Sequence, residues 1–337
     1  FAHNEPRWLG VAGHAAWVPA RRPVRLRTPF DLASLTKVLS TTPIALRLCT
    51  AGKLDLDAPL SEVVPGCPPG ITARHCLRHT SGLPAWAQLA HEAARGGWTW
   101  GSEATRDRVL RSILATPVRA APGERHCYSD LGMLLLSAAL EHVGGARLDR
   151  LFEREVRAPA DVDLRWGWPE AAATEHCPVR KRILAGEVHD LNCAVLGGFA
   201  GHAGLFGAAD QVAAAGAWQL RAWAGDSATG ISASLMRSAF TATALGGHGL
   251  GWDTVTPGIS AAGPLWSTEG VGHLGFTGTS LYLDPARQLS VAVLTNRVHP
   301  VVEGGSVPNA PVHPRYRAFK AWRPAVHSAI VNALNQG

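Results

Sequence analysis

The sequence predicts an α/β protein of the α+β type, with an antiparallel sheet flanked by helices and interrupted by an inserted all-helical subdomain. Two observations indicate this class: strand-like sequence occurs at both ends of the chain, and the long middle stretch reads as helices. We expect one module over residues 1–337. Its α/β subdomain is expected at about 1–54 and 246–337, and its mostly helical subdomain at about 55–245.

The first elements are a predicted strand and a predicted helix. The segment RWLGVAGHAAWV at residues 7–18 has the apolar and aromatic character of a strand and follows a His-Asn-Glu-Pro turn. From Leu35 to about Ala51, apolar residues recur as they do in a mostly buried helix, which Gly52 is expected to end. Pro43 is expected to bend this helix.

The middle and the C-terminal part differ in character. Helical patches such as DLGMLLLSAALEHVG are separated by Gly and Pro until about Gly246. Three short runs rich in aromatic and β-branched residues then follow, GLGWDTV, HLGFTGTSLYLD and LSVAVLTNRV, as in an antiparallel meander. The last stretch, RYRAFKAWRPAVHSAIVNALNQG, is predicted to be helical despite Pro324.

Composition excludes several classes of protein. The 337 residues are 46% hydrophobic and 17% charged, which is enough material for a sizeable core. The 32 Lys and Arg residues exceed the 26 Asp and Glu residues without forming a basic run, so no nucleic-acid partner is expected. No apolar stretch reaches the about 18 residues of a membrane span. The chain begins at Phe1 without a leader, so we expect an upstream segment to be missing, and compartment and oligomeric state stay open.

Lysine is rare in this chain, because nearly every basic residue is arginine. Lys37 lies three residues after Ser34, so the two side chains share a helical face and the amine can reach the hydroxyl. Arginine keeps its proton in proteins, whereas a partly desolvated lysine can release one. The pair therefore indicates proton transfer at a nucleophilic serine, although a simple helix cap at Ser34 would satisfy the same pattern.

Five segments carry a resemblance to a known family. FDLASLTKVLSTTPIALRLCTAGKLDLDAPL resembles the nucleophile helix of the serine β-lactamase and penicillin-binding-protein family, in particular its class C-like branch of DD-peptidases and esterases. ITARHCLRHTSGL is similar to that branch's T-x-R-H-L-L-x-H-T-S-G-L segment, YSD to its Y-x-N motif and GHLGFTGTSLYLDP to its H/K-x-G strand. VHDLNCAVLGGFAGHAGLF resembles a segment of one sub-branch. The resemblance implies a β-lactamase/transpeptidase-like fold.

The resemblance also implies catalytic roles. Ser34 would be the acylated nucleophile and Lys37 its hydrogen-bonded partner. Tyr128 would lie across the cleft as base for acylation and acid for the leaving group. His273 stands where many relatives have lysine, and it is expected to donate a hydrogen bond, in either protonation state, to a substrate carboxylate or to Tyr128.

The same resemblance implies a substrate-binding strand and a further part of the cleft. The N–H groups of Ser34 and Phe276 would form an oxyanion hole, Gly275 would leave room for substrate, and Thr277 would continue the strand. The sub-branch segment would bring three more side chains to the cleft, although a structural loop role is equally compatible with the sequence. These residues are His189, Asp190 and His202.

Two residues depart from the family pattern. Asp130 replaces the usual asparagine, so an ionised side chain there accepts from Lys37 but cannot donate to a substrate carbonyl. It also favours the charged amine, which shifts the expected general base towards Tyr128 without deciding between Tyr128 and Lys37. Leu274 replaces a common threonine and removes a hydroxyl that could bind a carboxylate.

The predicted function is a serine hydrolase that acts through an acyl-enzyme on a D-alanyl peptide, a β-lactam or a small ester, without cofactor or metal. One alternative is an inactive relative that serves as a binding or scaffold module. Another is a metal-dependent hydrolase that uses some of the fifteen histidines. Metal-ligand spacing is poor, because HEAAR lacks the second histidine of a zincin motif, and His75 and His79 fall within a segment that matches the family.

Overall fold

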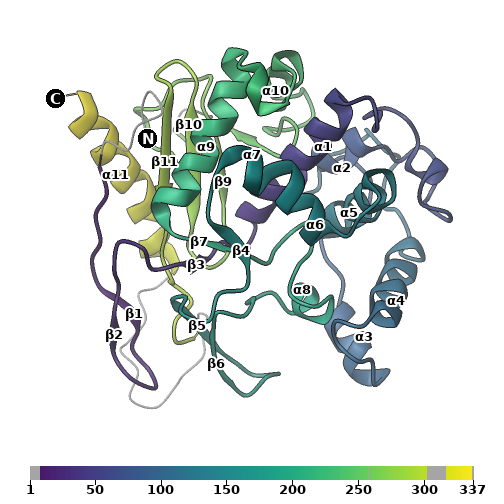
Figure 1. Cartoon of the computed structure of the whole chain (residues 1–337), viewed down its shortest axis with the longest axis horizontal. Coiled ribbons are helices and arrows are strands. Elements are labelled where there is room, and N and C mark those ends of the chain that lie inside the picture. The colour runs from purple at the N-terminus through teal and green to yellow at the C-terminus, as the bar shows by residue number, and fades with distance from the viewer. Residues whose placement is uncertain (1–7, 257, 302–315, 336–337) are drawn as a thin grey trace.

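The computed structural model describes residues 8–256, 258–301 and 316–335. A four-stranded antiparallel sheet lies between two helices, α9 (Ala209–Ala224) and α11 (Tyr316–Asn335) (Figure 1). The strand order is β11-β10-β9-β8, which confirms the predicted C-terminal meander. The strands are β8 (Asp253–Thr254), β9 (Val271–Leu274), β10 (Ser280–Asp284) and β11 (Leu289–Val293).

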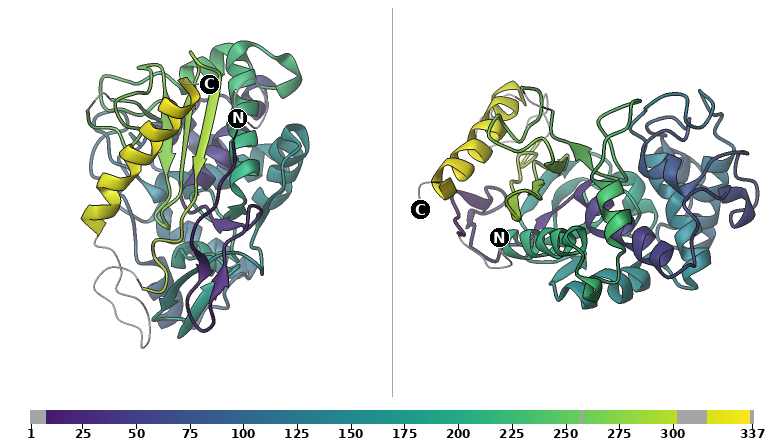
Figure 2. Two further views of the ribbon diagram at one scale, coloured as in Figure 1. Left: turned by 90° about the vertical axis from the view of Figure 1, so that its left-hand side faces the viewer. Right: turned by 90° about the horizontal axis from the view of Figure 1, so that it is seen from above.

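Buried side chains point alternately to the two faces of this sheet, which explains why helices cover both faces. Leu281 and Leu283 of β10 point into the main hydrophobic core, to which α9 contributes. Tyr282 between them packs in a second cluster with Val331 of α11. Successive strand residues face opposite sides, so a strand that is buried throughout needs a layer on each face. Figure 2 shows α11 running along the outer face of the sheet.

The helix that follows Ser34 begins with a π-helical segment, Lys37–Thr41, before α1 (Thr42–Thr50). The N–H of Thr42 donates to the carbonyl of Lys37, five residues earlier. Pro43 has no N–H to continue this pattern, so the carbonyl of Val38 lacks its helical donor. Gln219 of α9 donates to that carbonyl over 2.9 Å. The irregular turn around Lys37 is thereby fixed to the helix behind the sheet.

The middle of the chain contains most of the remaining helices but is less uniform than the sequence predicts. Four short strands occur within it, and one of them, β7 (Leu205–Gly207), pairs with β3 (Phe30–Asp31) just before Ser34. The other three are β4 (Leu164–Trp166), β5 (Ala173–Cys177) and β6 (Arg182–Ala185). These strands are three to five residues long, which is too short for a clear alternation. The division into two subdomains stays a prediction.

The strand predicted for residues 7–18 is shorter than expected. Within the described part of segment 7–18, only β1 (His14–Ala16) is a strand, and it pairs with β2 (Arg22–Pro23) in a separate two-stranded sheet. The other helices are α2 (Ala73–Leu77), α3 (Leu89–Arg95), α4 (Glu103–Leu114), α5 (Asp130–Gly144), α6 (Leu148–Phe152), α7 (Ala158–Ala160), α8 (Leu191–Val195) and α10 (Ala233–Ala239). The 3₁₀-helices are Leu60–Glu62 and Ser227–Thr229, and Glu153–Arg157 is a second π-helical segment. In the described ranges, none of the helices has the length and apolar character of a membrane span.

Candidate active site

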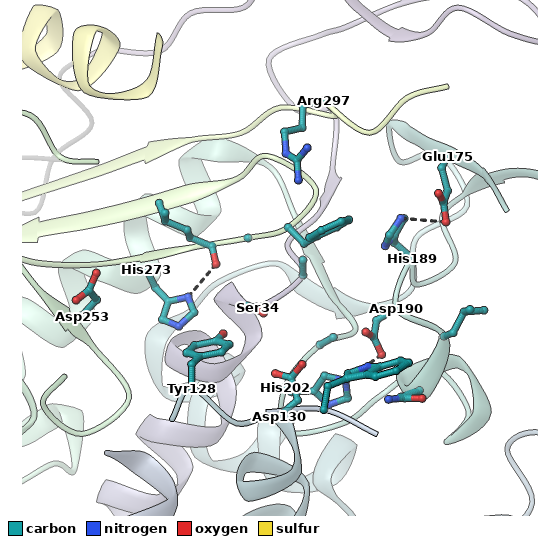
Figure 3. A pocket seen from close by; sticks show the side chains of 18 of the residues that line it. Ser34, Tyr128, Asp130, Glu175, His189, Asp190, His202, Asp253, His273 and Arg297 are labelled. Carbon is teal, nitrogen blue, oxygen red and sulfur yellow. Dashed lines mark hydrogen bonds and ion pairs between the residues drawn. The ribbon is translucent and has the colours of Figure 1, made fainter. Parts of the chain in front are cut away.

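A cleft of about 660 Å³ lies between β9 and the N-terminal ends of the helices that carry Ser34 and Asp130 (Figure 3). It collects most of the residues that the sequence singles out, although they come from segments far apart in the chain. Lys37 lies beneath the cleft, and Thr277 does not line it. The predicted residues that do line the cleft are Ser34, Tyr128, Asp130, His189, Asp190, His202, His273, Gly275 and Phe276.

The turn before Ser34 is held by the buried carboxylate of Asp31. Ala33 has a left-handed φ of 47°, which is uncommon for a residue with a side chain. Asp31 accepts a hydrogen bond from the N–H of Ala33 at 2.8 Å and another from the N–H of His189 at 2.6 Å. Burial raises the pKa of Asp31 despite these bonds. One carboxylate thus joins the turn that carries Ser34 to the segment that forms the opposite wall of the cleft.

Lys37 is fully buried, and its amine contacts three oxygens in addition to a hydrogen bond with the Tyr128 side chain. The Nζ lies 2.9 Å from Ser34 Oγ, 2.8 Å from Asp130 Oδ1 and 3.3 Å from the carbonyl oxygen of His202. An ammonium has three N–H donors, so this set satisfies the charged form. Burial by itself would lower the pKa of Lys37, but the nearby Asp130 and Tyr128 more than offset it and raise that pKa above its usual value. The geometry therefore favours a resting Lys37 that donates to Ser34.

Tyr128 lies beside this cation, and its hydroxyl points towards Ser34 (Figure 3). The amine of Lys37 is 4.8 Å from the centre of the phenol ring. The centre of the His79 ring lies 4.4 Å from the centre of the Tyr128 ring, and the centre of the His273 ring lies 6.0 Å from it. The tyrosine is thus placed between a fixed ammonium and imidazoles, where a phenol can exchange protons with the nucleophile.

His273 has a defined tautomer, which changes its predicted role. Its Nδ1 lies 3.0 Å from the carbonyl oxygen of Leu274, and since a carbonyl can only accept, Nδ1 carries the hydrogen. Burial, followed by the charge of Lys37, holds the pKa of His273 well below its ordinary value. The neutral ring therefore offers Nε2 as an acceptor. The expectation that His273 donates in either form is wrong for the neutral form, because its one N–H is already used.

Two more histidines gather near Tyr128 that the sequence analysis missed as site residues. His126 and His248 stack with ring centres 4.8 Å apart, and His126 Nε2 lies 3.2 Å from His248 Nδ1. Burial lowers the pKa of His248 to about 4. No sequence spacing could have joined residues from two distant loops. Within the described residues, no three His, Cys, Asp or Glu side chains are placed to hold a metal ion.

The opposite side of the cleft contains two histidine–carboxylate pairs. His189 Nε2 lies 3.2 Å from Glu175 Oε1, and His202 Nε2 lies 2.9 Å from Asp190 Oδ1. Asp190 also caps α8, because it accepts from the N–H of Cys193 at 2.7 Å. Burial opposes the charge of Asp190, but His202 and the capping N–H hold its pKa well below the usual range. Glu175, from β5, is a cleft residue that the sequence did not indicate.

The predicted oxyanion segment is present, with two changes of role. A side chain at Gly275 would meet Thr279 Oγ1 and the carbonyl oxygen of Leu32, so glycine is needed for packing against the nucleophile turn. The hydroxyl of buried Thr277 donates to the carbonyl oxygen of Asp31 at 2.7 Å and faces away from the cleft. Across the described chain, no hydrogen bond engages the N–H of Ser34 or Phe276. The oxyanion hole itself stays a prediction.

Comparison with known proteins agrees with this arrangement. The family model described as Beta-lactamase matches residues 2–309. The chain belongs to the beta-lactamase family. Its sequence is 33% identical to an N-acetylmuramyl-L-alanine amidase of Bacillus subtilis, in an alignment over 86% of this chain and 73% of that protein. It is 29% identical to a putative D-alanyl-D-alanine carboxypeptidase of Escherichia coli K12, over 90% of this chain and 77% of the relative.

Solved structures of other proteins have the same fold. EstCE1, a hydrolase with promiscuous acyltransferase activity, is 25% identical with a TM-score of 0.68, and the match covers 93% of this chain and 88% of that one. A penicillin-binding protein from Bacillus halodurans has a TM-score of 0.69 at 18% identity, over 88% and 90% of the two chains. The predicted fold class is confirmed, and the protein is a serine hydrolase of the β-lactamase, DD-peptidase and esterase type.

Proposed function

We propose that this protein hydrolyses an amide or ester bond through an acyl-enzyme on Ser34. The observation that carries the proposal is the hydrogen bond from the buried amine of Lys37 to Ser34 Oγ, at 2.9 Å. Because Asp130 and the carbonyl oxygen of His202 also lie against this amine, Lys37 orients the serine oxygen as a cation. A scaffold protein would have no need of this costly buried charge.

The proposed proton route runs through Tyr128. As Ser34 Oγ bonds to the acyl carbon, its proton passes to the Tyr128 oxygen while the phenol proton moves to His273 Nε2. The reverse movement gives one proton to the leaving nitrogen or oxygen as its bond to the acyl carbon breaks. Water then attacks the acyl-enzyme, and its proton returns to Ser34 by the same route. The low pKa of His273 makes its protonated form transient.

The proposed substrate is an amide in a peptidoglycan-derived peptide. Two relatives support this class: one is named for the N-acetylmuramyl-L-alanine bond and the other for the D-alanyl-D-alanine bond. The sequence-based candidates, a D-alanyl peptide, a β-lactam or a small ester, are chemically similar, since each presents an acyl carbon to a serine. Small esters therefore serve as convenient model substrates.

The proposal is tested by labelling the protein with a fluorophosphonate and with a fluorescent penicillin, and then mapping the modified residue by mass spectrometry. We expect the label on Ser34, and we expect Ser34→Ala to abolish hydrolysis of an activated aryl ester while it retains the parent's melting temperature. Ser61→Ala, at an exposed serine, is the matched control and should behave as the parent does. Turnover by Ser34→Ala within about tenfold of the parent would refute the mechanism.

A further inference from the structure

One carboxyl group in the cleft differs from the others in its partners. Of the four carboxylate residues that line the cleft, three have a positively charged or imidazole partner within 3.2 Å, namely Asp130, Glu175 and Asp190. The fourth, Asp253, makes no ion pair with any of the described residues, and its carboxyl group has a hydrogen bond from the backbone of Thr254. A partly buried carboxyl group without a positively charged partner is costly to ionise, so its presence in a binding cleft points to a role towards a ligand.

The position of Asp253 relates it to one side of the reaction. It lies in β8 opposite Gly272 of β9, next to His273, and on the same side of Ser34 as Tyr128 (Figure 3). Because Tyr128 is the proposed proton donor to the leaving group, this is the leaving-group side of the cleft. The two pairs Glu175–His189 and Asp190–His202 lie on the other side.

The arginines of the cleft are at the far end of β9. Arg323 donates to the carbonyl oxygen of Gly275, and the guanidinium of Arg297 lies 4.9 Å from the ring centre of Phe276. Gly272 and Gly275 are three residues apart, which is about 10 Å along an extended chain. These contacts place the two arginines at the Gly275–Phe276 end of β9, away from Gly272, the residue opposite Asp253.

We propose that Asp253 is a specificity residue that selects neutral or cationic leaving groups and rejects a leaving group with a free carboxylate. The inference rests on the proposed acyl-enzyme at Ser34 and narrows its substrate class. An amide whose leaving amine is the first residue of a longer peptide fits this side of the cleft. An amide that releases a free amino acid places a carboxylate near the carboxylate of Asp253.

Among the titratable groups around it, Asp253 is the one whose charge is expected to change near neutral pH. Burial raises the pKa of Asp253 to about 6, so it is ionised at pH 8. Burial also lowers the pKa of His248 to about 4 and that of His273 well below its usual value, so both rings are neutral between pH 5 and pH 8. The phenol of Tyr282 on β10 has its pKa raised to about 12, chiefly by burial. Lys37, behind Tyr128, keeps its charge throughout this range.

The test uses three aryl acetates of one shape that differ in the charge of the leaving phenol. They are 3-acetoxybenzoate (anionic), 3-acetoxybenzamide (neutral) and 3-acetoxy-N,N,N-trimethylanilinium (cationic). The measured quantity is kcat/KM for each, and the ratio of cationic to anionic substrate is corrected for the uncatalysed reactivities. For the parent at pH 8, we expect this ratio to exceed about tenfold.

Asp253→Asn removes the charge with little change in shape, and we expect it to lower the ratio at least about tenfold. Glu103→Gln, at an exposed residue outside the cleft, changes net charge equally and should leave the ratio unchanged. A second arm needs no mutation: in the parent, the ratio should fall as pH drops from 8 to 5, because Asp253 becomes protonated.

The results separate this inference from the proposed function. If the parent hydrolyses all three esters at similar corrected rates, or if neither Asp253→Asn nor acid changes the ratio, the inference is overturned while the acyl-enzyme stands. If none of the esters acylates Ser34, the proposed function fails, and the inference that rests on it fails with it. A ratio that falls in both arms supports the assignment of Asp253.

Discussion

The two sides of the cleft are built from the same residue types but have different electrostatics. The leaving-group side contains Tyr128, His248, Asp253 and His273, and no carboxylate pairs with its histidines in the described structure. The paired side contains Glu175, His189, Asp190 and His202, in two pairs with N···O distances of 3.2 and 2.9 Å. The two sides contain similar residue types, so the difference between them comes from whether a histidine and a carboxylate lie close enough to pair.

Burial is the largest influence on three groups of the leaving-group side, and it disfavours their charged forms. It lowers the pKa of His248 and His273 and raises that of Asp253. On the paired side, His202 more than offsets the burial of Asp190 and holds its pKa low. Lys37 stands between the two sides, and its charge is kept by Asp130.

The largest effect is expected at Lys37, where the two sides meet. Lys37→Arg keeps the charge but replaces a compact ammonium, buried among three acceptors, by a larger planar group. We expect kcat/KM for an activated ester to fall at least about a hundredfold. Lys53→Arg, at an exposed lysine, is the control and should match the parent. If the Lys37→Arg enzyme kept more than about a tenth of the parental activity, a positive charge at this position would be enough for catalysis.

The two sides should also respond to different ranges of pH. The unfolded chain protonates His248 near its ordinary pKa of 6.5, whereas the folded protein does so only at about 4, so stability is lost as pH falls between these values. After allowance for solvent screening, we expect a loss of about 1–2 kcal/mol from this group. Asp190 has a depressed pKa, so its stabilising contribution persists through that range and is lost only as the pH falls further.

Urea unfolding of the parent and of His248→Gln at pH 7 and pH 4.5 measures this difference. The variant should lose less stability on acidification than the parent does. His91→Gln, at an exposed position in α3, serves as control. Equal losses in the parent and in His248→Gln would show that His248 is not held neutral by burial.

A smaller effect is expected from the same chemical change on the paired side. Glu175→Gln removes a carboxylate that already has His189 as its partner and that lies away from Tyr128. We expect the ratio of cationic to anionic aryl acetate to change less than about threefold, in contrast to Asp253→Asn. If Glu175→Gln changed this ratio tenfold, the two sides of the cleft would not differ in their effect on the leaving group.

The smallest effect is expected from metal removal. In the described residues, no three His, Cys, Asp or Glu side chains are placed to hold one metal ion, so dialysis against a strong chelator should change neither esterase activity nor melting temperature. If activity were lost on dialysis and restored by zinc, the reaction would need a metal-dependent mechanism that uses the histidines of the cleft.

Much of the catalytic centre could be predicted because it depends on short spacings and on motifs. The Ser34–Lys37 contact follows from helical spacing, and the structure places the amine at 2.9 Å from the hydroxyl. The motifs identified Tyr128, Asp130 and His273 as residues, but not their distances. The short strands β4–β7 were missed, because three to five residues carry too little periodicity.

The sequence by itself determined the family, the fold class and the Ser34–Lys37 pair proposed as nucleophile and partner, since these are encoded in local patterns. Only the tertiary structure decided the charge of Lys37, the tautomer of His273 and the lack of an ion pair between Asp253 and the other described residues. Each of these depends on a partner, or the lack of one, brought from a distant segment: Asp130 for Lys37, the Leu274 carbonyl for the ring of His273, and burial beside β9 for Asp253. Protonation is set by local desolvation and nearby charge, and both exist only once the chain has packed.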